Sequence, residues 1–260
     1  MNTKIFVNSK FSLLDDFIKQ IPDDFSSIGN EIYNGRNEVR RVNVQGLELT
    51  IKYFRKVTLA NRYIYATFRK SKGQRAFEHS VQLLDLEVNT PEPIAYVDCY
   101  RNGKLEKSFY VSLFTNYKSL REIIAQPISE SEELIKAFAR FACRIHRAGV
   151  FHEDYNIDNV LYLFKENKYD FTVIDNNRMR FSDYSFGKAI RNLKRLSLPV
   201  EWIGIFTAEY ARESNSSDLK TLNLIVGYRY LYLFRISIRK RMKNVARMLL
   251  GKRKKAFFVF

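Results

Sequence analysis

Few cysteines, glycines and prolines occur in the sequence, and each shortage excludes a class of protein. The two cysteines among 260 residues, Cys99 and Cys143, form neither a CxxC pair nor a Cys/His cluster, so a zinc site is not expected. We expect two reduced thiols, as is usual in a cytosolic protein. Ten glycines and five prolines are too few for a collagen-like or low-complexity chain.

Long apolar runs are missing as well. No uncharged stretch approaches the roughly 20 residues that a transmembrane helix needs. Residues 1–7 contain neither the apolar core nor the cleavage site of a signal peptide. Hydrophobic residues nevertheless make up 46% of the chain and aromatic residues 15%, which excludes wholesale disorder and suffices for a packed core. We therefore expect a cytoplasmic protein of one or two domains, soluble or peripheral to a membrane.

Acidic residues are absent after Asp218. The chain has a net charge of +16, of which residues 219–260 carry +12 and residues 1–218 only +4. Periodicity from Leu233 to Leu250 separates apolar from basic residues, as in a helix lying on an anionic membrane. The alternative is a helix packed on the rest of the chain with a disordered basic end. No base-reading motif occurs, so specific nucleic-acid binding is not expected.

The first half of the chain has mostly strand patterns and the second half mostly helical ones. Period-2 alternation over 47–54 predicts a half-buried strand, and Asn34-Gly35 and Gln45-Gly46 are typical of tight turns between strands. We expect an α+β protein of two lobes that join near residues 115–118. The other elements expected are strands at 32–33, 39–44, 94–100, 109–114, 160–164 and 171–174, and helices at 71–87, 129–149 and beyond 185.

The stretch 145–161 carries the candidate chemistry. After a helix, a loop presents His152, Asp154 and Asn159 before a strand, and Asp175 follows the next apolar strand. Phosphoryl transfer from ATP needs one carboxylate that orients the attacking hydroxyl and accepts its proton. It also needs a second carboxylate and an amide oxygen to hold Mg²⁺. Magnesium takes few ligands from protein, so one Asp and one Asn suffice.

This loop resembles the catalytic loop of protein kinases, H-x-D-x-x-x-x-N, with Asp175 at the position of the aspartate in D-F-G. Upstream, Lys52 lies in a strand similar to the lysine-bearing strand of kinases, and Glu78 lies on the helix that follows. The resemblance implies a two-lobed kinase-like fold that uses ATP and Mg²⁺. It also implies the following roles: Lys52 on the α- and β-phosphates, Glu78 paired with Lys52, Asn159 and Asp175 on Mg²⁺, Asp154 on the acceptor hydroxyl, and His152 orienting the loop.

Residues 67–78 and 90–96 resemble one branch of this superfamily, the lipopolysaccharide kinases that phosphorylate Kdo or heptose sugars. The phosphate-covering turn has Gly35 in place of G-x-G-x-x-G, and Arg36 is expected to compensate. Glu153 replaces the arginine of H-R-D, which receives the activation-loop phosphate in regulated kinases. No A-P-E follows. These departures favour a small-molecule or glycolipid hydroxyl over a peptide as acceptor.

Several other residues have open interpretations. Arg178 and Arg180 could bind an anionic acceptor or belong to a solvated basic strand. Asp158 is expected to be a solvated loop acid, and residues 114–117 to line the adenine pocket through their backbone. The two remaining histidines, His79 and His146, are expected to be ordinary helix residues.

The leading hypothesis is an ATP-dependent kinase that phosphorylates a Kdo or heptose hydroxyl of the lipopolysaccharide inner core at the inner face of the inner membrane. Its partners would be the lipid A–core glycolipid and an anionic membrane, which residues 219–260 would contact. One alternative is a kinase-fold phosphotransferase for a soluble aminoglycoside-like molecule or for protein Ser/Thr. Another is a non-catalytic binding module. The expected division is an N-lobe over 1–115, a C-lobe over 116–218 and the basic segment over 219–260.

Overall fold

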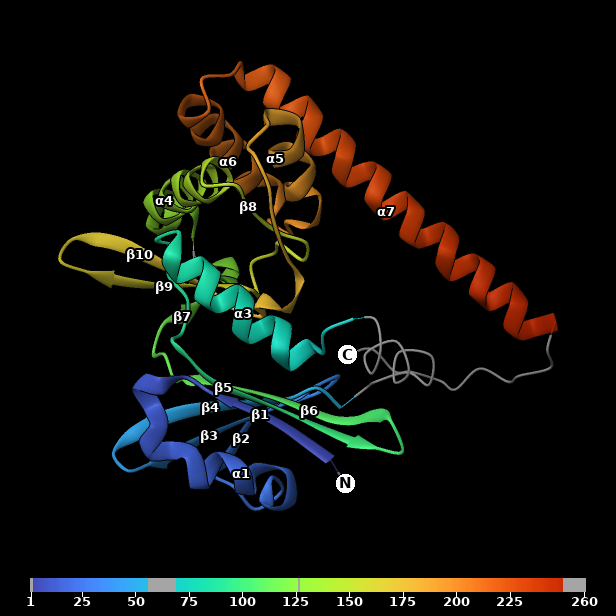
Figure 1. The fold of residues 1–260 in the computed structure, drawn as a ribbon. Coiled ribbons are helices and arrows are strands. Elements are labelled where there is room, and N and C mark those ends of the chain that lie inside the picture. The colour runs from blue at the N-terminus through green and yellow to red at the C-terminus, as the bar shows by residue number, and fades with distance from the viewer. Residues whose placement is uncertain (1, 56–68, 126, 250–260) are drawn as a thin grey trace.

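The computed structural model describes residues 2–55, 69–125 and 127–249 (Figure 1). An antiparallel sheet with two helices forms the N-terminal part, and a mainly helical part with two small sheets follows it. Two separate hydrophobic cores correspond to these parts. The predicted two-lobed α+β fold class is thus confirmed.

The N-terminal sheet has six strands in the order β1-β5-β6-β4-β3-β2, and every neighbouring pair is antiparallel. On β4 the alternation predicted from the sequence buries Leu49 and Ile51, while the intervening side chains are partly exposed. The strands comprise β1 (Asn2–Val7), β2 (Asn30–Asn34), β3 (Glu38–Val44), β4 (Leu47–Tyr53), β5 (Pro93–Arg101) and β6 (Lys104–Leu113).

The two turn dipeptides behave differently. Gln45 and Gly46 both have positive φ angles, as a tight hairpin turn requires. Gly35 does not have the positive φ that the sequence predicts. A Cβ atom there would lie 2.5 Å from the Tyr33 hydroxyl, so a larger residue would require the exposed Tyr33 side chain to shift.

The sheet is covered on both faces. On one side, the 3₁₀ turn η1 (Ser9–Leu14) and helix α1 (Asp15–Asp24) bury Leu14, Ile18 and Ile21 against the sheet. The sequence analysis did not predict these elements or β1. On the other side, α3 (Lys72–Asp85) contacts β5 and β6 and lies between the sheet and the C-terminal part (Figure 1).

Helices dominate the C-terminal part, and its core lies between α4 and α6. The helix α4 ends at Arg147 and is followed by Gly149, where φ is +75° and a Cβ atom would lie 2.6 Å from the Ser182 carbonyl oxygen. This glycine lets the chain turn directly into the strand before the catalytic loop. The elements are β7 (Lys118–Ser119), η2 (Leu120–Ala125), α4 (Ile128–Arg147), β8 (Val150–His152), β9 (Val160–Lys165), β10 (Lys168–Val173), η3 (Asn176–Arg178), β11 (Met179–Phe181), α5 (Phe186–Asn192), η4 (Leu193–Arg195), α6 (Val200–Glu213) and α7 (Asp218–Leu249).

His146 of α4 is fully buried, so it is more than an ordinary helix residue. Its Nδ1 lies 2.8 Å from the Tyr210 hydroxyl and its Nε2 lies 3.1 Å from Asn192 Oδ1. Burial lowers the pKa of His146 to about 4, although the Asn192 contact opposes the shift. The folded protein therefore holds this imidazole neutral.

We expect His146 to make the protein acid-sensitive. Below pH 6.5 His146 becomes protonated in the unfolded chain, whereas in the folded protein it stays neutral down to about pH 4. The free energy of unfolding therefore falls as the pH decreases across this interval. The loss amounts to up to about 3 kcal/mol. Urea unfolding of wild type and His146→Gln at pH 7 and pH 4 measures it. An equal pH dependence in both proteins would contradict the assignment.

The long helix α7 begins on the C-terminal part and extends away from it (Figure 1). Thr221 and Ile225 are buried where it packs on α5, α6 and η4. Beyond Tyr232, the described side chains are exposed except for the half-buried Ile236. No helix in the described part of the chain is long and apolar enough to cross a membrane.

Candidate active site

A cavity of about 680 Å³ lies between the two parts of the protein. Strands β2, β3, β4 and β6 line it on one side, and residues of the loop 152–159 and those after β10 line it on the other. Lys52, Asn159 and Asp175 all face this cavity. Its lining includes the apolar residues Val39, Leu161 and Ile174, with Phe114 and Thr115 beside them. An apolar lining of this kind suits an adenine ring.

The catalytic loop is held by hydrogen bonds to its own backbone. The Asp154 amide donates to His152 Nδ1 over 3.0 Å, and His152 Nε2 lies 3.0 Å from the Ile174 carbonyl oxygen. Burial lowers the pKa of His152, so the neutral ring accepts at Nδ1 and donates at Nε2. Both nitrogens are thereby occupied, and His152 orients the loop as the resemblance implies.

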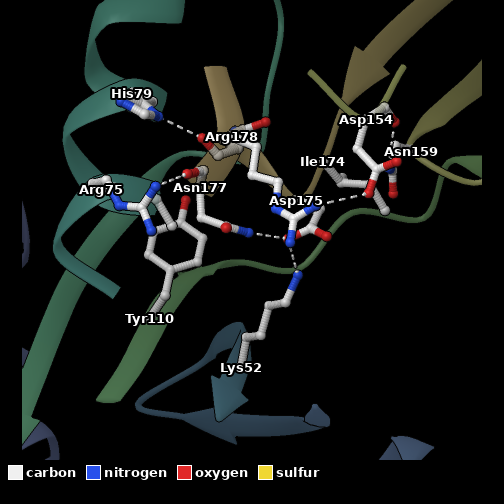
Figure 2. Close-up of polar contacts among 12 residues, drawn as sticks. Lys52, Arg75, His79, Tyr110, Asp154, Asn159, Ile174, Asp175, Asn177 and Arg178 are labelled. Atoms are coloured by element: carbon white, nitrogen blue, oxygen red, sulfur yellow. Dashed lines mark hydrogen bonds and ion pairs between the residues drawn. The ribbon is translucent and has the colours of Figure 1, made fainter. Parts of the chain in front are cut away.

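Asn159 closes the same loop. Its Nδ2 donates to the Asp154 backbone carbonyl over 2.9 Å (Figure 2). Its Oδ1 has no hydrogen bond to any residue in the described part of the chain. The amide oxygen is therefore available at the cavity wall.

Asp175 lies directly after the strand β10 in a left-handed backbone conformation, with φ 62° and ψ 43°. Its Oδ1 lies 2.5 Å from Lys52 Nζ and also accepts from Asn177 Nδ2 (Figure 2). Burial alone would raise the pKa of Asp175, but the Lys52 ammonium, with His152 and Arg178, lowers it overall. The carboxylate is thus ionised and fixed in the cavity.

The expected ion pair between Lys52 and Glu78 is not what the structure shows. Glu78 lies 2.8 Å from Lys70 Nζ and accepts from Gln74 Nε2 over 2.9 Å, while Lys52 pairs with Asp175. Lys70 precedes the helix that carries Glu78, so it reaches this carboxylate from nearby in the chain. The expectation was wrong for this state of the protein.

A different set of contacts connects α3 to the residues after Asp175. Arg75 Nη1 donates to the Asn177 carbonyl over 2.9 Å, and His79 Nδ1 lies 2.6 Å from the Asn176 carbonyl (Figure 2). His79 is therefore not the ordinary helix residue expected from the sequence. These contacts position α3 through the backbone of η3.

This arrangement predicts unequal effects for two neutralising substitutions. We expect Glu78→Gln to lower kcat/KM for ATP by no more than about threefold, because the pair it removes is half-exposed. Lys52→Met should lower it by about 100-fold, because it removes a charge from the cavity wall. Steady-state kinetics measure both. A large loss in Glu78→Gln would show that this residue pairs with Lys52 during turnover.

The turn between β2 and β3 lies over the cavity, but the predicted residues Gly35 and Arg36 do not line it. Tyr33 and Asn37 do so instead. Lys72, at the start of α3, is a further cation that the sequence analysis missed. Burial, followed by repulsion from Arg36 and Arg178, lowers its pKa to about 8, although Asp175 opposes the shift.

Two further expectations concern residues around the loop. Asp158 is exposed, as expected of a solvated loop acid, but its Oδ2 also accepts from Arg121 Nη2 over 2.6 Å and it lines the cavity. Of residues 114–117, Phe114 and Thr115 line the cavity, whereas the hydroxyl of Tyr117 donates to Asp170 Oδ2 over 2.6 Å.

The Asp154 carboxylate is paired with two arginines. Arg195 Nη1 lies 2.5 Å from Oδ1, and Arg178 Nη1 lies 3.7 Å from Oδ2. The sequence left Arg178 open between binding an anionic acceptor and belonging to a solvated basic strand, and no motif points to Arg195, which lies in the short helical stretch η4. Arg180 pairs with Glu153 over 3.1 Å beside the loop.

The donor atoms present fit a magnesium ion bound together with ATP. Asp175 and Asn159 supply a carboxylate and an amide oxygen on the same cavity wall, which are hard ligands of the kind that Mg²⁺ accepts. The described residues contain no group of three or more His, Cys, Asp or Glu that could hold a metal alone. A site completed by phosphate oxygens is consistent with both observations.

Similarity to known proteins is found among solved structures. A search of curated proteins finds no match. Among solved structures, WaaP in complex with acyl carrier protein matches with a TM-score of 0.59 and 17% identity, over 91% of this chain and 98% of that one. A MAP kinase from Leishmania major matches with a TM-score of 0.42 and 18% identity, over 83% of this chain and 66% of that one.

A family model decides the assignment. The model of the lipopolysaccharide kinase (Kdo/WaaP) family matches residues 22–216, which include the whole cavity and the catalytic loop. The chain therefore belongs to the lipopolysaccharide kinase (Kdo/WaaP) family and is an ATP-dependent phosphotransferase with a protein-kinase-like fold.

Proposed function

We propose that this kinase transfers the γ-phosphate of ATP to a Kdo or heptose hydroxyl of the lipopolysaccharide inner core. The observation that carries the proposal is the meeting of Lys52, Asn159 and Asp175 in one cavity, with Asp154 on the adjoining loop. Family membership supports a lipopolysaccharide acceptor, and the absent peptide-kinase motifs support a sugar rather than a protein.

The residues take distinct roles in this proposal. Lys52 moves from Asp175 to the α- and β-phosphates as ATP enters, because the triphosphate offers more negative charge than one carboxylate. Asp175 and Asn159 hold Mg²⁺, which neutralises charge on the phosphates when it is bound. Asp154 orients the sugar hydroxyl for in-line attack on the γ-phosphorus and accepts its proton.

We place the protein at the inner face of the inner membrane, and α7 supports this location. An apolar stripe along the distal part of α7 is exposed. The exposed fraction is 65% for Met242 and 55% for Val245. The stripe comprises Leu231, Phe234, Ile238, Met242, Val245 and Met248, and exposed basic residues flank it at Arg235, Arg239, Lys240, Arg241 and Lys243. Apolar burial and attraction to anionic headgroups act together on such a surface.

Vesicle binding tests this role of α7. We expect the full chain to cosediment with phosphatidylglycerol-containing vesicles, less at high salt, and with pure phosphatidylcholine vesicles much more weakly. Replacing Phe234, Ile238 and Met242 with Ser should reduce binding by about tenfold or more, because each side chain would bury apolar area in the lipid. Val200→Ser is the matched control, because Val200 is an 82% exposed apolar residue outside the stripe. Equal binding by all three proteins would contradict the proposal.

Acceptor profiling tests the proposed reaction. Purified protein with labelled ATP should phosphorylate Kdo–lipid A or heptosylated core, and mass spectrometry should show a missing core phosphate in cells that lack the protein. Transfer to an aminoglycoside or a peptide, with none to the glycolipids, would replace the proposal by one of its alternatives.

A further inference from the structure

Arg195 holds the carboxylate that the reaction needs free. Its Nη1 lies 2.5 Å from Asp154 Oδ1, and its side chain is 28% exposed. Its Nε is buried and has no hydrogen-bond partner among the described residues. The guanidinium therefore has one buried donor left over, beside the donor that Asp154 occupies. Arginine donors in this fork arrangement match a planar carboxylate or a phosphate.

The position of Arg195 separates it from the ATP site. Neither Arg195 nor Asp154 lines the cavity between the two parts of the protein. The Arg195 Cζ lies instead 5.2 Å from the ring centroid of Tyr232 on α7. Arg195 thus lies on the α7 side of Asp154, where an acceptor approaching from that helix would meet it.

The surroundings of Arg195 are rich in positive charge. Burial, followed by repulsion from Arg195 and Arg191, lowers the pKa of the neighbouring Lys194. Arg178 lies 3.7 Å from the second oxygen of Asp154. An anion entering here would relieve repulsion between these cations as well as gain its own contacts.

The pair between Arg195 and Asp154 is unsuited to proton transfer. While Arg195 Nη1 lies 2.5 Å from Asp154 Oδ1, this oxygen is occupied by a donor and cannot accept the proton of an acceptor hydroxyl. The ATP side of the site shows the same relation, since Lys52 rests on Asp175. On that side the phosphates of ATP are the anion that would draw the lysine away.

We propose that Arg195 binds an anionic group of the acceptor, a carboxylate or a phosphate, and is thereby drawn away from Asp154. The inference rests on the proposed function and deepens it. It requires the acceptor to carry a negative group beside the hydroxyl that is phosphorylated. A neutral sugar would leave Asp154 paired and would be a poor substrate.

Matched acceptors test this selection. We compare Kdo–lipid A with two forms of it, one with the Kdo carboxyl converted to an amide and one with the lipid A phosphates removed. Wild type should prefer the intact acceptor to one of the altered forms by about 10- to 100-fold in kcat/KM. Arg195→Gln should lose that preference while its KM for ATP stays unchanged, and Arg195→Lys should retain part of it. The altered acceptor that wild type phosphorylates more slowly identifies the ligand: the amide form points to the carboxylate, and the dephosphorylated form points to the phosphate.

Arg191→Gln is the matched control. Arg191 lies one helical turn before Arg195, and its Cζ is 5.6 Å from the ring centroid of Tyr228 on α7. Unlike Arg195, Arg191 forms no ion pair with Asp154 in the described part of the chain. The Arg191→Gln variant should therefore keep the acceptor preference. If Arg195→Gln slows all acceptors equally or raises the KM for ATP, the residue acts on fold or donor and the inference is overturned.

ATP hydrolysis without acceptor separates the two proposals. Releasing Asp154 in Arg195→Gln should raise hydrolysis by a few fold, since water can then use the free carboxylate. If wild type phosphorylates none of the glycolipids, the proposed function is wrong. The rate of ATP hydrolysis without acceptor still tests whether Arg195 restrains Asp154. Unchanged or lower hydrolysis in a variant that melts like wild type would overturn the inference.

Discussion

Asp154→Asn is expected to lower kcat by about 10³-fold, because in the proposed reaction it removes the group that accepts the proton of the attacking hydroxyl. The amide keeps the shape of the side chain and the loop hydrogen bonds, which involve the backbone of Asp154. Since Asp154 does not line the ATP cavity, the KM for ATP should stay within about threefold of wild type. Steady-state transfer to the glycolipid acceptor, with ATP titrated, measures both quantities.

The control for this experiment is Glu153→Gln. Glu153 is the next residue in the loop and forms an exposed pair with Arg180, so its neutralisation should change kcat by less than about threefold. If Asp154→Asn retained wild-type kcat, the phosphotransferase site would have to lie elsewhere. Equal losses in the two variants would indicate a general effect of loop charge.

Asp175→Asn is expected to lower kcat/KM for ATP by about 10³-fold or more. The substitution removes the cavity carboxylate that is paired with Lys52, and in the proposed reaction a metal held there contributes several kcal/mol to charge stabilisation. Raising the Mg²⁺ concentration should restore part of the activity, whereas it should not restore Asp154→Asn. Activity as a function of Mg²⁺ concentration makes this distinction.

Asp170→Asn is the matched control for Asp175. It lies on β10, the strand that precedes Asp175, but its carboxylate accepts from the Tyr117 hydroxyl and it does not face the cavity. Its activity and its Mg²⁺ dependence should match wild type. A Mg²⁺ dependence of Asp175→Asn indistinguishable from that of wild type would exclude this residue as the metal ligand.

Much of the fold could be predicted because its signals are local. Alternation along β4 and helical spacing along α3 and α4 reflect burial of one face, which a short window of sequence records. The elements at the start of the chain, β1 and α1, were missed. Their burial depends on strands β4 and β5, which come later in the chain.

The site shows the same division between local and distant information. The spacing of His152, Asp154 and Asn159 was sufficient to predict the loop, since the hydrogen bonds among these three residues join positions at most five apart. The partner of Lys52 was not predictable. Asp175 lies 123 residues from it, and the competition with Glu78 depends on where α3 packs.

By itself the sequence determined the class of chemistry. The order Lys52, Asp154, Asn159 and Asp175 along suitable elements indicates phosphoryl transfer, because each element presents its residue through local geometry. Only the tertiary structure decided which charges meet. It placed Lys52 on Asp175 and Arg195 on Asp154, because electrostatic pairing depends on distances of a few ångströms between segments that the chain order leaves far apart.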